Sequence, residues 1–377
     1  MAGANAAMTP RERLTATLTG RPIDRPPVSL YEIDGFGTRW SPDHPSYTRV
    51  RSFVRKNCDN MILETPSIPG PYGFLYSGGD PGLVIVETRR AGDDEITRTT
   101  IATPRGPLSM ETRISPDIYT VWTTEFLCKN EEDVRRLLSL PFEPLAPDFA
   151  DFDTLNAEVG DSGIMMPDVN DPIVMVSSVM QFEDYITLAT LSRPLFRRLL
   201  DFFAERIGYW LDAVTERTTG IIYRIVGPEL CTPPYMPPEW FREFIVEYDR
   251  PFIDTIRKSG SFARIHCHGN IAKVAHMMLE MEPDALDPLE EPPGGDIAFG
   301  DAKRILGGSI CLMGNIQESM FELAKPENVV REVRRIKEIG APDGRFVVMP
   351  TATPISVPLT SRQEENLFAY LETALEQ

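Results

Sequence analysis

Two histidines that lie two residues apart are the side chains with the clearest chemical potential in this sequence. The chain has 377 residues but only four histidines, and two of them, His266 and His268, flank Cys267. They end an apolar run, residues 262–267, with the pattern of a β-strand. Because residues i and i+2 of a strand share a face, we expect both imidazoles to project together and Cys267 to point away. This pair indicates a metal site or acid–base catalysis, with simple hydrogen bonding at a strand end as the alternative.

A metal site would need a third protein ligand, and the sequence offers carboxylates for it. Catalytic zinc is held by three protein ligands and keeps one position open. Two histidines and one carboxylate form a sound ligand set, and Glu290 is our predicted third ligand beside His266 and His268. Glu229 is the other candidate for that position. The spacing alone does not choose between them, and an exposed acidic loop is the alternative for Glu290.

Further candidate residues follow the apolar runs along the chain. In a parallel barrel, functional groups collect at the carboxyl ends of the strands. We therefore predict catalytic roles for Glu229, Asp168, Asn315, Gln317 and Tyr235, and substrate-binding roles for Tyr31, Glu32, Asn170, Asn270 and Thr351. A turn role is the alternative for Asn315 and Gln317, and a loop or capping role is the alternative for Glu229.

The elements that must position these residues alternate between apolar strands and amphipathic helices. This alternation predicts a parallel sheet with helices on its outer faces. The expected strands cover residues 28–30, 61–63, 164–166, 221–226, 262–267, 285–289, 310–313 and 346–349. The expected helices cover residues 10–18, 130–138, 182–190, 192–215, 238–258, 271–281, 297–306, 326–339 and 361–375.

Eight strands of this kind favour an α/β fold closed into a (β/α)8 TIM barrel. A doubly wound open sheet is the alternative, although no G-x-G-x-x-G motif follows the first strand. Residues 83–87, 95–102 and 108–113 alternate with period two, which predicts an antiparallel β-ribbon inserted over residues 81–114. We expect one domain over residues 1–377, with a disordered tail over residues 1–8.

Composition limits the partners and the compartment. The formal net charge of −18 excludes nucleic acid as an expected partner, because phosphate backbones are bound by basic surfaces. No run of about 18 apolar residues predicts a membrane span. The first residues lack a secretory signal, and the five scattered cysteines do not suggest a disulfide framework. We therefore expect a cytoplasmic protein.

Several motifs, spread nearly end to end, resemble one superfamily. They are Asp24-Arg25-Pro26-Pro27-Val28, Gly227-Pro228-Glu229 with Pro237 to Phe241, His266-Cys267-His268-Gly269-Asn270, Asp287-Pro288-Leu289-Glu290 with Gly295-Asp296, and Gly314-Asn315-Ile316-Gln317. Together these motifs resemble the uroporphyrinogen decarboxylase superfamily, which includes zinc-dependent corrinoid:coenzyme M methyltransferases. The resemblance implies a barrel with its site in the barrel mouth.

The sequence departs from both main chemistries of this superfamily. Decarboxylases carry arginines after the first strand and a histidine after the last, whereas residues 30–36 lack arginine and residues 350–354 lack histidine. The methyltransferases bind zinc through His-x-Cys and a later Cys. Here His268 stands at the position of the first Cys, and no cysteine follows Cys311. A nitrogen and oxygen site would leave zinc more Lewis-acidic, and suited to activating water, a hydroxyl or a thiol.

The resemblance lies nearer the methyltransferase branch, and it leads to one principal hypothesis. We expect a zinc-dependent methyltransferase or demethylase-like enzyme that moves a methyl group between a small substrate or corrinoid and an acceptor. A corrinoid protein is the expected partner, and a homodimer the expected assembly. One alternative is a metal-free decarboxylase or lyase, with His266, His268 and Asp168 as acid–base groups. The other is a non-catalytic barrel that binds a tetrapyrrole or corrinoid.

Overall fold

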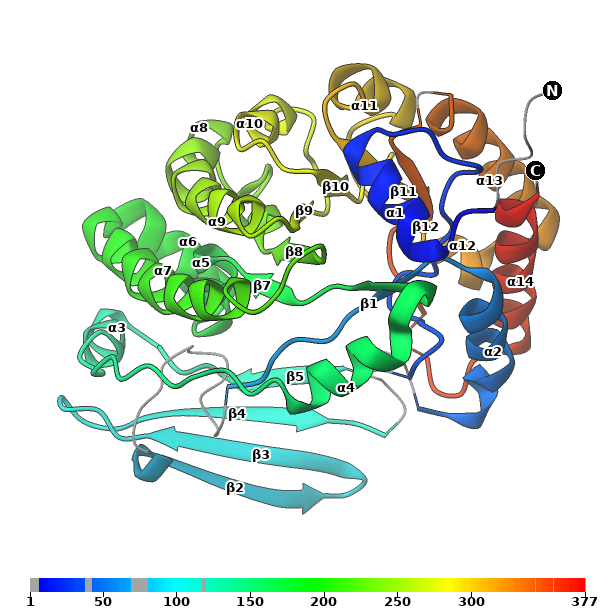
Figure 1. Cartoon of the computed structure of the whole chain (residues 1–377). Coiled ribbons are helices and arrows are strands. Elements are labelled where there is room, and N and C mark those ends of the chain that lie inside the picture. The colour runs from blue at the N-terminus through cyan, green and yellow to red at the C-terminus, as the bar shows by residue number, and fades with distance from the viewer. Residues whose placement is uncertain are drawn as a thin grey trace, which may run out of the picture.

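Short parallel strands form the centre of an α/β fold, with helices packed around them (Figure 1). The computed structural model describes residues 7–37, 43–68, 81–116, 120–342, 344–354 and 356–376. The central strands are β1 (Asn60–Ile62), β6 (Gly163–Met165), β7 (Asp168–Asn170), β8 (Ile222–Val226), β9 (Phe262–His266), β10 (Ala285–Asp287), β11 (Cys311–Ile316) and β12 (Phe346–Pro350). Nearly all of their residues are buried, as expected for strands covered on both faces.

The central strands pair in two parallel sheets. Six strands follow the order β12-β11-β10-β9-β8-β7, and β1 pairs separately with β6. Val28 links the two sheets, because it bridges Val348 of β12 and its carbonyl accepts a hydrogen bond from the Asp59 amide at 2.8 Å. Within the described residues the regular ladders therefore do not form one closed eight-stranded sheet. Their order is consistent with the predicted barrel, but the first expected strand, residues 28–30, is reduced to a single bridge.

The helices lie on the outside of these strands (Figure 1). Their apolar faces supply much of a single cluster of buried side chains. They are α1 (Pro10–Thr19), α2 (Thr48–Asn57), α3 (Glu131–Leu137), α4 (Ala150–Val159), α5 (Pro172–Ser178), α6 (Phe182–Leu191), α7 (Arg193–Thr215), α8 (Pro238–Phe241), α9 (Glu247–Lys258), α10 (Ala275–Glu280), α11 (Phe299–Leu306), α12 (Ser319–Leu323), α13 (Pro326–Gly340) and α14 (Ser361–Leu375).

Most of the predicted helices are confirmed, with two differences beside the candidate site. The expected helix over residues 271–281 begins only at Ala275, because turns occupy the residues after His268. The expected helix over residues 238–258 is divided by a π-helical stretch, Arg242–Val246. The expected strand over residues 285–289 ends at Asp287, since Pro288 has no amide hydrogen to continue the ladder.

The predicted ribbon is part of a four-stranded antiparallel sheet. It contains β2 (Val84–Ala91), β3 (Asp94–Ile101), β4 (Leu108–Ile114) and β5 (Val121–Glu125), in the order β2-β3-β4-β5. The sequence predicted three of these strands and missed β5. In Figure 1 the sheet lies beside the parallel core, with β2 at its outer edge.

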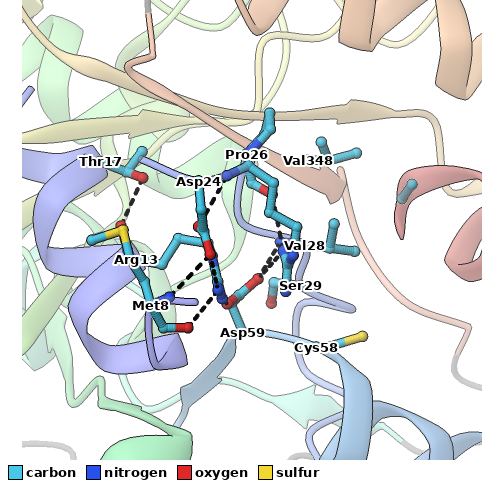
Figure 2. A network of polar contacts seen from close by, with 12 residues as sticks. Met8, Arg13, Thr17, Asp24, Pro26, Val28, Ser29, Cys58, Asp59 and Val348 are labelled. Carbon is cyan, nitrogen blue, oxygen red and sulfur yellow. Dashed lines mark hydrogen bonds and ion pairs between the residues drawn. The ribbon is translucent and has the colours of Figure 1, made fainter. Parts of the chain in front are cut away.

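A buried carboxylate ties the start of the chain to the first strands. Asp59 accepts hydrogen bonds from the guanidinium groups of Arg13 and Arg25 and, at 2.9 Å, from the Val28 amide (Figure 2). Arg13 also donates to Asp24 and to the Met8 carbonyl. Residues 1–6 of the expected disordered tail lie outside the described residues, but Met8 is held by this network.

No helix in the described part of the chain is long and apolar enough to span a membrane. The five cysteines are all buried and free. Cys267 is fully buried, in agreement with its expected orientation away from the two histidines.

Candidate active site at the strand ends

His266 is the centre of a hydrogen-bonded chain at the end of β9. Its register partner on β10 is Asp287, and His266 Nδ1 lies 2.8 Å from the Asp287 carboxylate. A carboxylate only accepts, so Nδ1 carries the hydrogen and Nε2 accepts from the Tyr31 hydroxyl at 3.3 Å. Burial lowers the pKa of His266 to about 4. His266 is therefore a neutral imidazole with both nitrogens engaged.

A buried ion pair fixes the carboxylate that orients His266. Arg264 lies two residues before His266, on the same face of β9, and donates two hydrogen bonds to Asp287. Neither side chain of this pair is exposed. Burial alone would raise the pKa of Asp287, but the charge of Arg264 and the hydrogen bonds from Arg264 and His266 outweigh it and hold that pKa well below its usual range. Asp287 thus stays ionised and keeps the histidine in one tautomer.

A second buried arginine, Arg224, extends the series of hydrogen bonds beyond Tyr31. Arg224 of β8 donates two hydrogen bonds to Asp168 of β7, at 2.6 and 3.0 Å, and one to the Tyr31 oxygen. Its Nη1 also lies 3.6 Å from the Glu32 carboxylate. Burial raises the pKa of Glu32. Both buried arginines therefore have carboxylate partners within the site.

His268 forms a separate dyad that is open to solvent. Its Nδ1 lies 3.1 Å from Glu290, and its side chain is 36% exposed, against 9% for His266. Burial would lower the pKa of His268, but the hydrogen bond and the charge of Glu290 outweigh it and raise that pKa. Glu290 is anchored in turn by the Gly269 amide at 2.9 Å. With Nδ1 bound to Glu290, Nε2 of His268 is the nitrogen that can face a substrate.

The predicted zinc ligands do not lie in a metal-binding arrangement. His266, His268 and Glu290 are neighbours, with 4.6 Å between the two imidazole centroids. However, the ring nitrogens of His266 face Asp287 and Tyr31, and Nδ1 of His268 faces Glu290. Across the described ranges, no three His, Cys, Asp or Glu side chains are grouped so that they could hold a metal ion. As it lies, this donor set does not fit a zinc ion bound by three protein ligands.

Comparison with known proteins agrees with the family resemblance of the sequence. The family model described as uroporphyrinogen decarboxylase (URO-D) matches residues 89–373. The chain belongs to the uroporphyrinogen decarboxylase family. Two methylcobamide:CoM methyltransferases named MtaA, both from Methanosarcina barkeri, are each 21% identical over 343 residues, which is 89% of this chain and 90% of theirs. The similarity of this family member therefore extends to the methyltransferase branch.

A solved structure supports the fold of this URO-D family member. A methyltransferase from Methanosarcina mazei aligns with a TM-score of 0.60 and 16% identity, covering 97% of this chain and 98% of that one. At this level of identity the likeness shows the fold alone.

The structure places Glu229 and Gln317, two predicted catalytic residues, beside the dyad. Burial raises the pKa of Glu229, and the charge of His268 partly offsets that rise. A Cβ at Gly294 would lie 2.9 Å from Gln317 Oε1 and 3.4 Å from Glu290 Oε1, so the Gln317 side chain lies close to Glu290. Among the described residues, Glu229 Oε2 and Gln317 Nε2 are buried polar atoms with no hydrogen-bond partner. Each of these two buried atoms therefore has an unsatisfied hydrogen-bonding capacity beside the dyad.

Other predicted residues have structural contacts instead. The Asn315 side chain bonds both backbone groups of Leu289, and Thr351 caps the Glu318 amide at 3.1 Å. Tyr235 is 50% exposed and packs on Phe182, with 4.9 Å between the ring centroids.

Two predicted substrate-binding asparagines lie at strand ends. Asn170 ends β7 and Asn270 follows Gly269, and both are half-buried.

The sequence reasoning missed two residues of this site, Arg224 and Arg264, whereas Thr353 was expected beside Thr351 after the last strand. Thr353 donates to Glu32 at 3.3 Å. Both arginines lie within strands that were treated as uniformly apolar, and they are register partners across β8 and β9. The available signal was the alternation Arg264, His266 and His268, which places three polar side chains on one strand face.

Proposed function

We propose that this chain is a methyltransferase that moves a methyl group from a small methylated substrate or a methylated corrinoid to an acceptor at the strand ends. The observation that carries the proposal is the half-exposed His268–Glu290 dyad in a chain similar to methylcobamide:CoM methyltransferases over 89% of its length. A corrinoid protein is the proposed partner.

The dyad supplies a base for the acceptor. Glu290 holds the hydrogen on Nδ1 of His268, so Nε2 accepts the proton of an acceptor O–H or S–H group. The acceptor atom then forms its bond to the methyl carbon while the bond from methyl to donor breaks, and that electron pair stays with the donor. The raised pKa of His268 strengthens it as a base, because Glu290 stabilises the imidazolium that results.

The remaining groups position and select the substrate. Consecutive hydrogen bonds link the side chains of Arg224, Tyr31, His266 and Asp287, and they fix these side chains beneath the dyad. The two buried arginines, Arg224 and Arg264, are neutralised by Asp168 and Asp287, so they offer little attraction to an anionic substrate. With the overall charge of −18, this pairing favours a small substrate without several carboxylates.

A methyl-transfer assay tests the proposal. Purified protein is incubated with a free methylcobamide and a panel of small thiols and alcohols, and the visible spectrum and methylated products are followed. We expect His268→Gln to lower the rate by about 10²–10⁴-fold, the usual contribution of a general base. The matched control is His276→Gln, an exposed histidine on α10, which should retain the wild-type rate. Turnover that is unaffected by His268→Gln would overturn the assignment of the base.

Zinc dependence, which the family resemblance implies, is a separate question for metal analysis. The arrangement of donors supports a base without metal, so we expect no stoichiometric zinc in the purified protein. If the wild type binds zinc and His266→Ala does not, the donor side chains must rearrange around a metal. That outcome would contradict the mechanism in which the dyad acts as the base.

A metal-free decarboxylase or lyase is the second candidate. The observation that favours it is that the pKa of His266 is lowered while the pKa of His268 is raised. When two neighbouring groups have pKa values shifted in opposite directions, one can act as the acid and the other as the base. Asp168, the third expected acid–base group, is bound by Arg224 and fits a positioning role better. Release of CO2 from a carboxylated substrate, without methyl transfer, would favour this candidate. Tight corrinoid binding without any turnover would point instead to a binding barrel.

A further inference from the structure

The carboxyl groups of the candidate site outnumber the side chains that neutralise them. Each positive side chain of the site has one close carboxylate partner: Arg224 with Asp168, Arg264 with Asp287, and His268 with Glu290. Glu32 and Glu229 are two further carboxyl groups of the same site, and within the described residues no cation is left over for either of them. The site therefore has more negative than positive charge to offer a ligand.

Glu32 is paired only weakly. Its Oε1 lies 3.6 Å from Arg224 Nη1, whereas Arg224 donates two shorter hydrogen bonds, of 2.6 and 3.0 Å, to Asp168. Its Oε2 accepts a hydrogen bond from the Thr353 hydroxyl at 3.3 Å, and this hydroxyl carries no charge. The Glu32 side chain is 24% exposed, so a ligand that enters at the strand ends can reach it.

Glu229 is less exposed and lies beside the dyad. Burial raises its pKa, and the charges of His268 and Arg224 offset part of that rise, so its carboxyl group lies near both side chains. Its Oε2 is buried and has no hydrogen-bond partner among the described residues. Buried polar atoms of native proteins nearly always have a partner, so this oxygen indicates that a ligand belongs beside it.

The two carboxyl groups suit an organic cation better than a metal ion. Magnesium and calcium need several oxygen atoms that converge on them at about 2.0–2.6 Å. In the part of the chain that the structure describes, no three acidic, histidine or cysteine side chains are grouped in that way. A methylated ammonium or sulfonium forms no directed bonds, and carboxylates several ångströms away can balance its charge. The net charge of −18 also attracts cations to the protein.

We propose that the methyl donor bound at the strand ends is a small organic cation, a methylated ammonium or sulfonium, whose charge is balanced by Glu229 and Glu32. This inference rests on the proposed methyl transfer and names the chemical class of its donor. The acceptor atom bonds the methyl carbon while the bond from the methyl group to nitrogen or sulfur breaks. That electron pair leaves with a neutral amine or thioether, and the proton of the acceptor passes to Nε2 of His268. The positive charge thus moves from the donor to His268, and Glu229 lies near enough to balance it there as well.

Ligand-observed NMR titration of the full chain tests the proposal without requiring turnover. The probes are tetramethylammonium and trimethylsulfonium, and tert-butanol is a neutral control of nearly the same size and shape. We expect at least one of the cations to bind roughly tenfold more tightly than tert-butanol, as one opposite charge in a partly buried site would produce. Glu229→Gln and Glu32→Gln should each weaken cation binding by roughly threefold or more. The matched control is Glu327→Gln, an exposed acid at the start of α13, which should bind like the wild type.

The outcomes separate this inference from the proposed function. An unchanged near-ultraviolet circular dichroism spectrum confirms that each variant is folded. Methyl transfer by a protein that binds neither cation more tightly than tert-butanol overturns the cationic donor and leaves the transferase. Cation binding that both glutamine variants retain in full, or that magnesium displaces more strongly than sodium at equal ionic strength, also overturns the inference. Carboxylate-dependent cation binding without any methyl transfer supports the cation site and overturns the proposed function.

Discussion

Replacing Asp287 with asparagine isolates the energetic role of the ion pair beneath His266. The change preserves size but leaves the Arg264 guanidinium without a counter-charge, at a position where neither partner is exposed. Within the described part of the chain, the other polar contacts of the Arg264 guanidinium are methionine sulfurs, the nearest being that of Met166 at 3.0 Å. Removing one partner of such a buried pair costs about 3–5 kcal/mol. Against a typical total of about 5–15 kcal/mol, this is a large share of the free energy of unfolding.

Equilibrium unfolding in urea, followed by circular dichroism, measures the loss. The second variant needed is Asp287→Asn with Arg264→Met, which removes the unpaired charge and should recover part of the stability. Because the pKa of Asp287 is held below its unfolded value, its contribution is present above about pH 4 and is lost as the pH falls further. A loss below about 1 kcal/mol in the single variant, or a larger loss in the double variant, would refute an uncompensated charge as the cause.

Three further predictions concern other buried or paired carboxylates. Glu290→Gln should lower the pKa of His268, since Glu290 raises it, and an NMR titration of the four histidines that leaves this pKa unchanged would contradict the dyad. Burial raises the pKa of Glu229, so wild-type stability should fall as the pH rises above about 4.3. The Glu229→Gln variant should lack that slope in unfolding measurements at several pH values. Asp59→Asn should cost about 3 kcal/mol, because it leaves two arginines without their shared carboxylate, whereas the exposed Asp161→Asn should change the melting temperature little.

Local patterns in the sequence were sufficient to predict most of the elements. The period of the apolar residues identified the long helices, for example α7 and α14, and the parallel strands β8, β9 and β12. The short elements were harder. β5 and α12 have five residues each, too few for a period to stand out. The short first strand was overestimated, because only Val28 forms a bridge and a turn begins at Tyr31.

The sequence predicted the histidines and Glu290 of the candidate site, but it did not predict the two buried arginines. His268 lies two residues beyond the end of β9, but its imidazole is still 4.6 Å from that of His266, and Glu290 lies beside His268. The arginines were missed because a charged residue inside an apolar strand is stable only if a distant carboxylate neutralises it. Arg224 depends on Asp168, 56 positions away, and Arg264 depends on Asp287, 23 positions away.

The alternation of helices and strands, the proximity of the two histidines and the family resemblance could all be predicted from the sequence, because each depends on local spacing or motifs. The tertiary structure alone decided the partners of those histidines. Hydrogen bonds and burial act between residues that are remote in the chain, and they make His266 a neutral, fully engaged imidazole and His268 the more basic, open one. The same side chain therefore has two different chemistries at positions two residues apart.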